Sequence, residues 1–480
     1  MLSRQNTSVM VLISGIEIER GRGTARVYPY EQCPQPRTHE SMERRAIGAI
    51  EKGVPQEGVK GPSLLSSLNH FDLVNGFVPD FLHCALLGVA RQFVSLWFES
   101  KNHCEPWYIG QPTKQTQYDQ LLRGITVPKE VRRLPRSITT REHWKANEFK
   151  TFVLYFSLIV LEGLLPSLYL NNFFLFVWSL HKLLSTSISP TDIVKVEAVL
   201  NYFILRTGEL YGEGNCTYNI HQLSHLASST RMCGPLWAVL TFDFEGNNAV
   251  LKNMFQGTQY IADQIGNDYV MSKAMPYLMK QHAKGNEYLL DVCEGMFGKT
   301  RTKKATLLLN NLLALSKPRV RYLSEEETLA TRIVFDCPVN RIVYEYNRFL
   351  WNEKVYDTSS YTRSTKRQNS MVKLNIAGEI HFGQLNGLVT VKHSCVCQIS
   401  NHEQCNCEKD NLIFCSLFNV IDNETFKCSH FNITSEFLCE VELTSRIVCL
   451  RLDSIITKCV KVFKGNRLFL VEMPNMLEFE

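Results

Sequence analysis

The sequence predicts an α+β protein whose middle is helical and whose end is built from strands. Between residues 145 and 300, Leu, Phe and Val recur at positions i, i+3 and i+4, the spacing of one face of a helix. After about residue 330 the apolar positions alternate, which is typical of half-buried strands. The predicted divisions are an irregular N-terminal segment over 1–60, a main part over 61–330 with a helical block at about 145–230, and a small β-rich domain over 331–480.

The first helix of the main part is predicted just after Asp80. Residues 1–60 are polar and show little periodicity, so much of this segment is expected to be loop or disorder. From His83 to Trp97 the apolar residues return at helical spacing. Asp80 therefore stands at the head of a helix, where residues i and i+3 share one turn and Asp80 faces His83.

The helical block is expected to be a bundle of buried helices, with Pro166 and Pro190 marking two of its turns. The apolar run over 151–170 could be mistaken for a membrane span. Glu162, Gly163 and Pro166 interrupt it before about 20 apolar residues are reached. No membrane partner is therefore expected.

Two further elements are predicted after the helical block. The apolar stretch over 305–315 is interpreted as a helix between basic flanks. The alternating segment over 460–471 contains Lys464-Gly465-Asn466, a sequence typical of the tight turn of a β-hairpin.

The composition allows a folded protein and only weakly restricts its partners. The 480 residues are 45% hydrophobic and 21% charged, which is ordinary for a chain with a substantial core. A net charge of +5 permits nucleic-acid binding without requiring it. No cleavable secretory signal is visible, so we expect a nuclear or cytoplasmic protein that is not secreted.

The 16 cysteines are then interpreted as reduced thiols or metal ligands. The best metal-like spacing is Cys395-Val-Cys397 followed by Cys405-Asn-Cys407, because two such pairs could surround one tetrahedral zinc ion. The alternative is a surface loop of reduced cysteines between two strands.

Asp80 and His83 are candidate metal ligands, and each has a structural alternative. Asp80 could be only a helix-capping carboxylate, and His83 could be a core histidine. His221 and His225 stand four residues apart, a spacing that can bind zinc on one helix face. No glutamate follows His221 directly, so the metalloprotease pattern fails, and packing or capping is favoured for this pair.

Basic residues are concentrated in two stretches that could contact DNA phosphates. Residues 111–150 hold nine Lys or Arg against four acids. The second stretch, over 299–321, has no acid, and its basic residues are Lys299, Arg301, Lys303, Lys304, Lys317, Arg319 and Arg321. A solvated surface is the alternative for both stretches.

A set of longer motifs resembles one family over most of residues 24–480. They are Arg26-Val-Tyr-Pro-Tyr30, Arg37-Thr-His-Glu40, Gly58-Val-Lys-Gly-Pro-Ser63, the segment from Asp80 to Trp97, Leu134-Pro-Arg-Ser-Ile138, Trp144-Lys-Ala146, the segment from Tyr218 to Leu226, the segment from Trp237 to Asn248, the segment from Tyr361 to Ser370, and Pro474-Asn-Met-Leu-Glu-Phe-Glu480. Together they resemble the DDE transposases of the CACTA (En/Spm) type.

The resemblance implies a catalytic fold similar to RNase H and a site with three carboxylates. In that family the carboxylates hold two divalent cations, Mg²⁺ by preference, that activate a nucleophile for attack on a phosphodiester. Here Asp80 would be the second acid, His83 its partner in the Asp-x-x-His signature, and Glu245 the last acid. The helical block would be the insertion between the two acids, and the RNase H-like core would be partial.

The first acid of the family has no counterpart, because Asp72 is the only aspartate before Asp80 and belongs to the same segment. The expectation is therefore a transposon-derived protein that begins too late for the first acid, binds Mg²⁺ poorly and lacks strand-transfer activity. Two alternatives are a domesticated DNA- or chromatin-binding module and a truncated fragment with no selected function.

Overall fold

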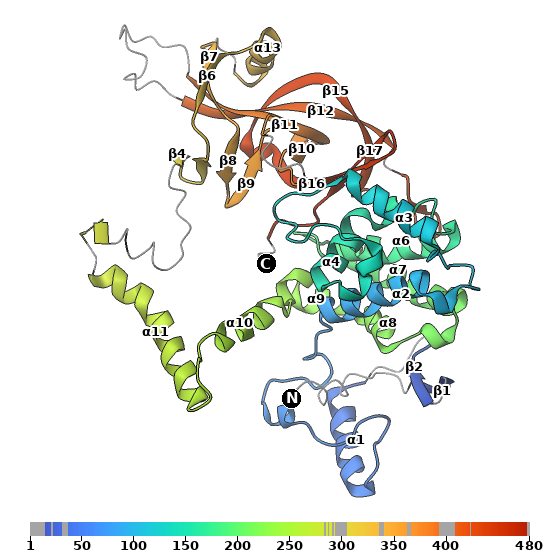
Figure 1. The fold of residues 1–480 in the computed structure, drawn as a ribbon. Coiled ribbons are helices and arrows are strands. Elements are labelled where there is room, and N and C mark those ends of the chain that lie inside the picture. The colour runs from blue at the N-terminus through green and yellow to red at the C-terminus, as the bar shows by residue number, and fades with distance from the viewer. Residues whose placement is uncertain are drawn as a thin grey trace.

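The fold is α+β, with a helical body in the middle of the chain and a β domain at its end (Figure 1). The computed structural model describes residues 15–20, 23–30, 37–282, 285–286, 288–289, 292, 305–335, 340–361, 366–392, 409–422 and 424–477.

The N-terminal region has more regular structure than the sequence predicts. Its elements are β1 (Ile16–Arg20), β2 (Gly23–Val27), α1 (His39–Lys52) and the 3₁₀ turn η1 (Leu64–Ser67). The helix forms because Thr38 and Ser41 make a reciprocal cap at its start, and Gly53 ends it in the left-handed conformation. Met42, Ala46, Val59 and Leu73 form a small core of their own.

The helical body runs from Asp80 to residue 240 and contains the predicted bundle. Its main helices are η2 (Leu82–Ala90, a π-helix), α2 (Arg91–Phe98), α3 (Pro112–Leu121), α4 (Ala146–Thr151), η6 (Phe152–Phe156, a π-helix), α5 (Ser157–Leu161), α6 (Ser167–Leu183), α7 (Pro190–Tyr211), α8 (Tyr218–Gln222) and α9 (Leu226–Cys233). Shorter turns are η3 (Ser100–Asn102), η4 (Leu122–Gly124), η5 (Ile138–His143), η7 (Glu213–Asn215), η8 (Leu223–His225) and η9 (Leu236–Val239).

The body is followed by an arm, α10 (Phe242–Lys252) and α11 (Ile261–His282), which extends away from it (Figure 1). None of the described side chains of α11 is buried. Within residues 37–282, all of them described, the only strand is β3 (Ile125–Thr126), which pairs with the C-terminal sheet. Residues 61–110 are therefore helices and loops, and the sheet of an RNase H-like core is not seen in them.

The β domain begins earlier than predicted, at β4 (Thr306–Leu309) and β5 (Leu312–Ala314). The predicted helix over 305–315 is wrong: Asn310 and Asn311 form the turn between these two strands, and β5 pairs with β8. The small sheet has the order β4-β5-β8-β9, with β8 at Arg348–Trp351 and β9 at Lys354–Asp357.

The large sheet is antiparallel, and six of its strands close into a ring. Its order is β10-β16-β17-β15-β12-β11-β7-β6, and β10 also pairs with β11. The strands are β6 (Arg319–Tyr322), β7 (Ile342–Tyr346), β10 (Met371–Ile376), β11 (Glu379–Lys392), β12 (Lys409–Asp422), β15 (Leu438–Arg451), β16 (Ile455–Lys464) and β17 (Arg467–Glu472), with α13 (Glu325–Val334), η10 (Leu452–Ser454) and the pair β13 (Lys427–Cys428) and β14 (Ile433–Thr434) between them. The predicted hairpin is confirmed, because Lys464 pairs with Arg467 across Gly465 and Asn466.

The helical body and the β domain share one core. It contains aromatic side chains of α2, η6, α6 and α7 together with Val462, Phe469 and Val471 of β16 and β17. Phe93, for example, contacts the rings of Trp97, Phe173 and Phe203 at centroid distances of 5.6, 5.9 and 5.6 Å. No described helix has the length and apolar character needed to cross a membrane.

Trp178 lies in α6 and is 2% exposed. Replacing it with alanine should lower the free energy of unfolding by about 3–5 kcal/mol, because a large enclosed ring is removed. Chemical denaturation monitored by circular dichroism measures this change. Leu168→Ala, on the same helix at 51% exposed, is the matched control and should change stability little. An unchanged denaturation midpoint for Trp178→Ala would contradict the core assignment.

Candidate functional site

Asp80 and His83 are in direct contact at the start of η2. Asp80 Oδ2 is 2.5 Å from His83 Nδ1 and accepts the backbone N–H of His83 at 3.0 Å. Asp80 therefore caps the helix and orients the imidazole with the same oxygen. The His83 side chain is 55% exposed and that of Asp80 16%, so His83 is not a core histidine.

The other oxygen of Asp80 reaches a segment far along the chain. Asp80 Oδ1 accepts the backbone N–H of Thr241 at 3.4 Å, across 161 residues. Thr241 directly precedes α10, and Glu245 lies one turn further into this helix. The backbone that carries Glu245 thus begins beside Asp80, although the Glu245 side chain lies outside the described part of the structure.

Tight packing of η2 on α8 holds the Asp80 turn in place. Cys84 Sγ donates to the carbonyl of Asn219 at 3.5 Å. A Cβ atom at Gly88 would lie 2.5 Å from Cγ of Asn219, so a larger residue there would force the Asn219 side chain to move. Phe81 and Leu82, next to Asp80, are each 1% exposed. These contacts fix the first turn of η2 against the helical body.

Asp72 does not take the place of a first acid. Its Oδ1 accepts the backbone N–H groups of Val74 and Asn75, each at 2.7 Å. These two hydrogen bonds lower the pKa of Asp72, since they favour the charged carboxylate. Asp72 is therefore a turn-forming residue.

The described residues hold no group of three or more His, Cys, Asp or Glu side chains that could bind a metal. Asp80 and His83 provide two such groups within one turn. A Mg²⁺ ion prefers several oxygen ligands in octahedral geometry, so this pair would need Glu245 or water to complete its shell.

His221, which is buried, and His225, which is half-buried, form a pair on α8 and η8. Their Nε2 atoms are 3.4 Å apart, and Tyr28 stacks on the His221 ring at a centroid distance of 5.5 Å. Burial lowers the pKa of both imidazoles to about 4, with the charge of His225 as a second cause at His221. The geometry agrees with the packing role favoured for them.

The remaining candidate residues divide into those described and those that are not. Cys395, Cys397, Cys405 and Cys407 and the basic residues Lys299, Arg301, Lys303 and Lys304 all lie outside the described residues. Lys317 and Arg319 are exposed. Arg321 instead donates to both oxygens of Glu327, at 2.6 and 2.7 Å, and lies 2.9 Å from Glu345. These ion pairs engage its guanidinium within the β domain, and its DNA-binding assignment stays a prediction.

Sequence reasoning missed a clamp formed by Arg367. Its guanidinium donates to four carbonyls of the 128–132 loop, and Asn369 accepts the N–H of Lys129 at 2.7 Å. Arg367 stands inside one of the motifs that carry the family resemblance, but no local spacing links it to a loop more than 200 residues earlier.

Comparison of the chain with protein-family models, with curated proteins and with solved structures gave no match.

Two buried histidines, His181 and His221, and the half-buried His225 make stability depend on pH. Burial is the main cause that lowers the pKa of His181 to about 4, as it does for His221 and His225. The unfolded chain has ordinary histidines with pKa about 6.5, so it binds more protons between pH 6.5 and 4. The free energy of unfolding should therefore fall as the pH falls through this window.

Thermal denaturation at constant ionic strength from pH 7.5 to 4.5 measures this loss. The double variant His221→Gln/His225→Gln should show a shallower decline, and His103→Gln, at an exposed position, is the matched control. If the melting temperature of the double variant falls with pH as steeply as that of the wild type, the role assigned to the pair is contradicted.

Proposed function

We propose that this chain is a transposon-derived protein similar to the CACTA-type DDE transposases, in which Asp80, His83 and Glu245 are the remnant of the catalytic site. One observation carries the proposal: the Asp80 carboxylate contacts both His83 and the N–H of Thr241, which precedes the helix that holds Glu245. This contact supports the proposal, because the two motifs are separated by a helical block in the sequence and the resemblance predicts that they meet.

The helical block supports the same ancestry. The body from α4 to α9 lies between the two acidic segments in the sequence and packs into one core. This is the place of the insertion in the related transposases. We propose the RNase H-like fold for the ancestral transposase from which this site derives.

The chemistry that the two acids can supply is limited. Two Mg²⁺ ions carry four positive charges, and a transposase site balances them with three carboxylates and the phosphate of the substrate. Asp80 and Glu245 provide two carboxylates. We therefore propose that the ancestral activity was that of a metal-dependent DNA transposase and that this chain binds Mg²⁺ weakly and does not transfer DNA strands.

The purified chain should bind Mn²⁺ weakly and should not nick plasmid DNA in Mg²⁺ or Mn²⁺. Asp80→Asn should weaken Mn²⁺ binding by about tenfold, since a charged ligand is lost. Calorimetry and a plasmid-nicking assay measure the two properties. Glu442→Gln, which removes an exposed carboxylate of β15, is the control. If the wild type and Asp80→Asn bind Mn²⁺ equally well, Asp80 is not part of a metal site. If the wild type nicks DNA in a metal-dependent way and Asp80→Ala does not, the proposed inactivity is wrong.

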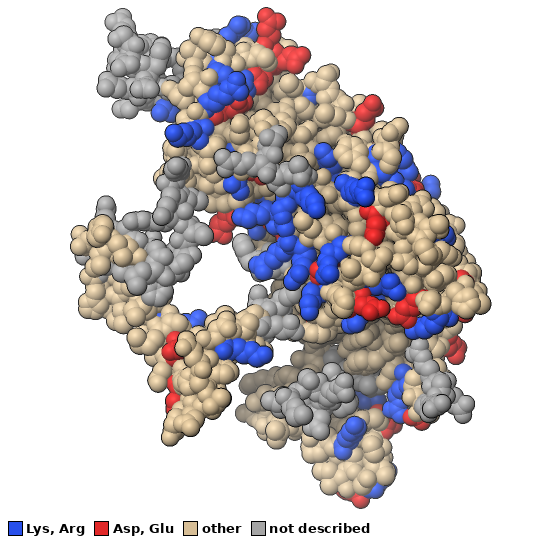
Figure 2. All heavy atoms as spheres, viewed as in Figure 1, with Lys and Arg blue, Asp and Glu red and all other residues tan. Residues whose placement is uncertain are grey.

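A second candidate function, binding of duplex DNA, is favoured by a basic cluster around Glu148. The Glu148 carboxylate is 2% exposed and pairs with Arg136 at 3.1 Å and with Arg133 at 3.6 Å. One negative charge is therefore paired with two positive charges. The two arginines are 39% and 51% exposed. Figure 2 shows Lys and Arg gathered over the region around α4. Such a surface fits DNA phosphates, and a DNA partner would be met in the nucleus.

If the cluster binds DNA, the affinity for a duplex should fall steeply with salt, as a contact to each phosphate releases counterions. Arg133→Gln/Arg136→Gln should reduce the slope of log K against log salt concentration by about 2. Fluorescence anisotropy at several salt concentrations measures this slope. Arg446→Gln, at an exposed position of β15, should leave the slope unchanged. No measurable duplex binding at low salt would contradict this function and favour a fragment without selected function.

A further inference from the structure

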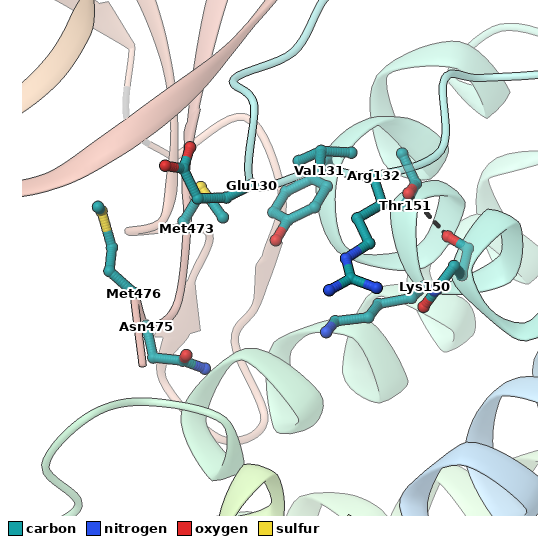
Figure 3. A pocket seen from close by; sticks show the side chains of 10 residues that line it. Glu130, Val131, Arg132, Lys150, Thr151, Met473, Asn475 and Met476 are labelled. Carbon is teal, nitrogen blue, oxygen red and sulfur yellow. Dashed lines mark hydrogen bonds between the residues drawn. The ribbon is translucent and has the colours of Figure 1, made fainter. Parts of the chain in front are cut away.

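The small cavity beside α4 offers little room for a ligand (Figure 3). Its volume is about 30 Å³, whereas sites for drug-sized ligands span about 300–1,000 Å³. In its wall, Glu130 Oε1 accepts a hydrogen bond from the buried Lys458 at 2.7 Å. Lys150 and Tyr155 of the same wall also interact with other groups. This cavity is therefore part of the packing between the helical body and the β domain.

A larger, open groove lies on the outer face of α7. Its volume is about 540 Å³, which is within the range of small-molecule sites. Tyr30, which follows β2, and Phe431, in the turn between β13 and β14, line two of its sides. Four residues of α7 line the rest and share one face of the helix at positions i, i+3, i+4 and i+7: Ala198, Asn201, Tyr202 and Leu205.

Hydrogen bonds and ring contacts hold the Phe431 side of the groove in place. The backbone N–H of Phe431 donates to the carbonyl of Cys428 at 3.3 Å. Lys195 of α7 donates to the carbonyl of Asn432 at 3.0 Å. The Phe431 ring contacts that of Tyr202 at a centroid distance of 5.4 Å. The groove is therefore formed before a ligand arrives, which lowers the entropy cost of binding.

The groove combines aromatic rings with one amide. Three of its six residues, Tyr30, Tyr202 and Phe431, are aromatic, and none of the six is Asp, Glu, Lys, Arg or His. Such a lining favours a neutral, flat ligand. Asn201 is half-buried, and its amide has no hydrogen-bond partner among the described residues. An amide has both donors and an acceptor, which match the donors and acceptors on the edge of a nucleobase.

We propose that the groove on α7 binds a nucleobase, stacked against its aromatic rings and hydrogen-bonded at its edge by Asn201. Stacking on aromatic side chains is the usual way in which proteins hold an unpaired base. A quaternary ammonium group also binds aromatic rings, but it has no hydrogen-bonding groups and would leave the Asn201 amide unused. The base can belong to a free nucleoside or to an unpaired nucleic-acid strand. The groove contains neither Asp80 nor the basic cluster around Glu148, so the proposal is independent of the proposed functions.

Titration of the full chain with adenosine, followed by saturation-transfer NMR, tests the groove. Saturable binding is expected, with more saturation on the protons of the base than on those of the ribose. Asn201→Ala should weaken binding by about tenfold, since the hydrogen bonds of one side chain are lost. Alanine favours the helix at this position, so folding should be retained. Asn171→Ala removes an exposed amide of α6 and is the matched control.

A second variant tests the stacking. Phe431→Leu keeps an apolar side chain but removes the ring, so adenosine binding should weaken by about fivefold or more. A short oligodeoxyadenylate strand then separates the two sources of the base. Binding of the strand that is tighter than that of adenosine, with the gain lost in Phe431→Leu, assigns the groove to an unpaired strand. Adenosine binding that needs Phe431, without such a gain, assigns it to a free nucleoside.

Three results would overturn the proposal. The first is no saturable binding of adenosine or of the strand by the wild type. The second is adenosine binding that Asn201→Ala and Phe431→Leu leave unchanged, or that Asn171→Ala reduces as much as they do. The third is displacement of adenosine by an equal concentration of choline, which would identify the groove as a site for a quaternary ammonium group.

Discussion

The burial of α6 is the constraint on which the rest of the structure depends. Thirteen of its 17 residues are buried, and the ten consecutive residues from Asn172 to His181 are buried on every side of the helix. Part of this enclosure comes from the β domain: the His181 ring stacks on Phe437 at a centroid distance of 3.8 Å, and Phe174 packs on Phe426. Neither the helices nor the sheet could bury this surface alone, so the two parts fold around one core.

Polar contacts at the boundary between the helical body and the β domain fix how the two parts pack against each other. Lys464, at the turn of the β16–β17 hairpin, donates to the carbonyls of Ile159 and Glu162 at 2.9 and 2.7 Å. Arg467, across that turn, lies 3.3 Å from Glu162 and 2.7 Å from Glu440. This boundary places the 128–132 loop against α4. The helical body also holds η2 where Asp80 meets the N-terminus of α10. The Asp80 site therefore depends on this packing arrangement.

Structure that depends on residues close together in the sequence could be predicted, whereas structure that depends on contacts between distant residues could not. The helix after Asp80 and the hairpin at Gly465 have their signals within a few residues, and both were predicted. The helix predicted over 305–315 is wrong, because the leucines of this segment fit a helix or two strands equally well. Pairing with β8 decides between the two. The ion pairs of Arg321 with Glu327 and Glu345 depend on the pairing of β6 with β7 and on the position of α13, which no spacing reveals.

The candidate site shows the same division. The contact between Asp80 and His83 follows from their spacing on one turn, whereas the approach of Thr241 to Asp80 required the whole helical body to fold. The most direct test of a shared site is affinity cleavage, in which Fe²⁺ replaces Mg²⁺ and, with ascorbate and peroxide, cuts the backbone near the bound ion. At saturating Fe²⁺ the account predicts cuts near both residue 80 and residue 245, suppressed by Mg²⁺ and by Asp80→Asn. Cuts near only one of these residues, or a pattern that Asp80→Asn leaves unchanged, would contradict it.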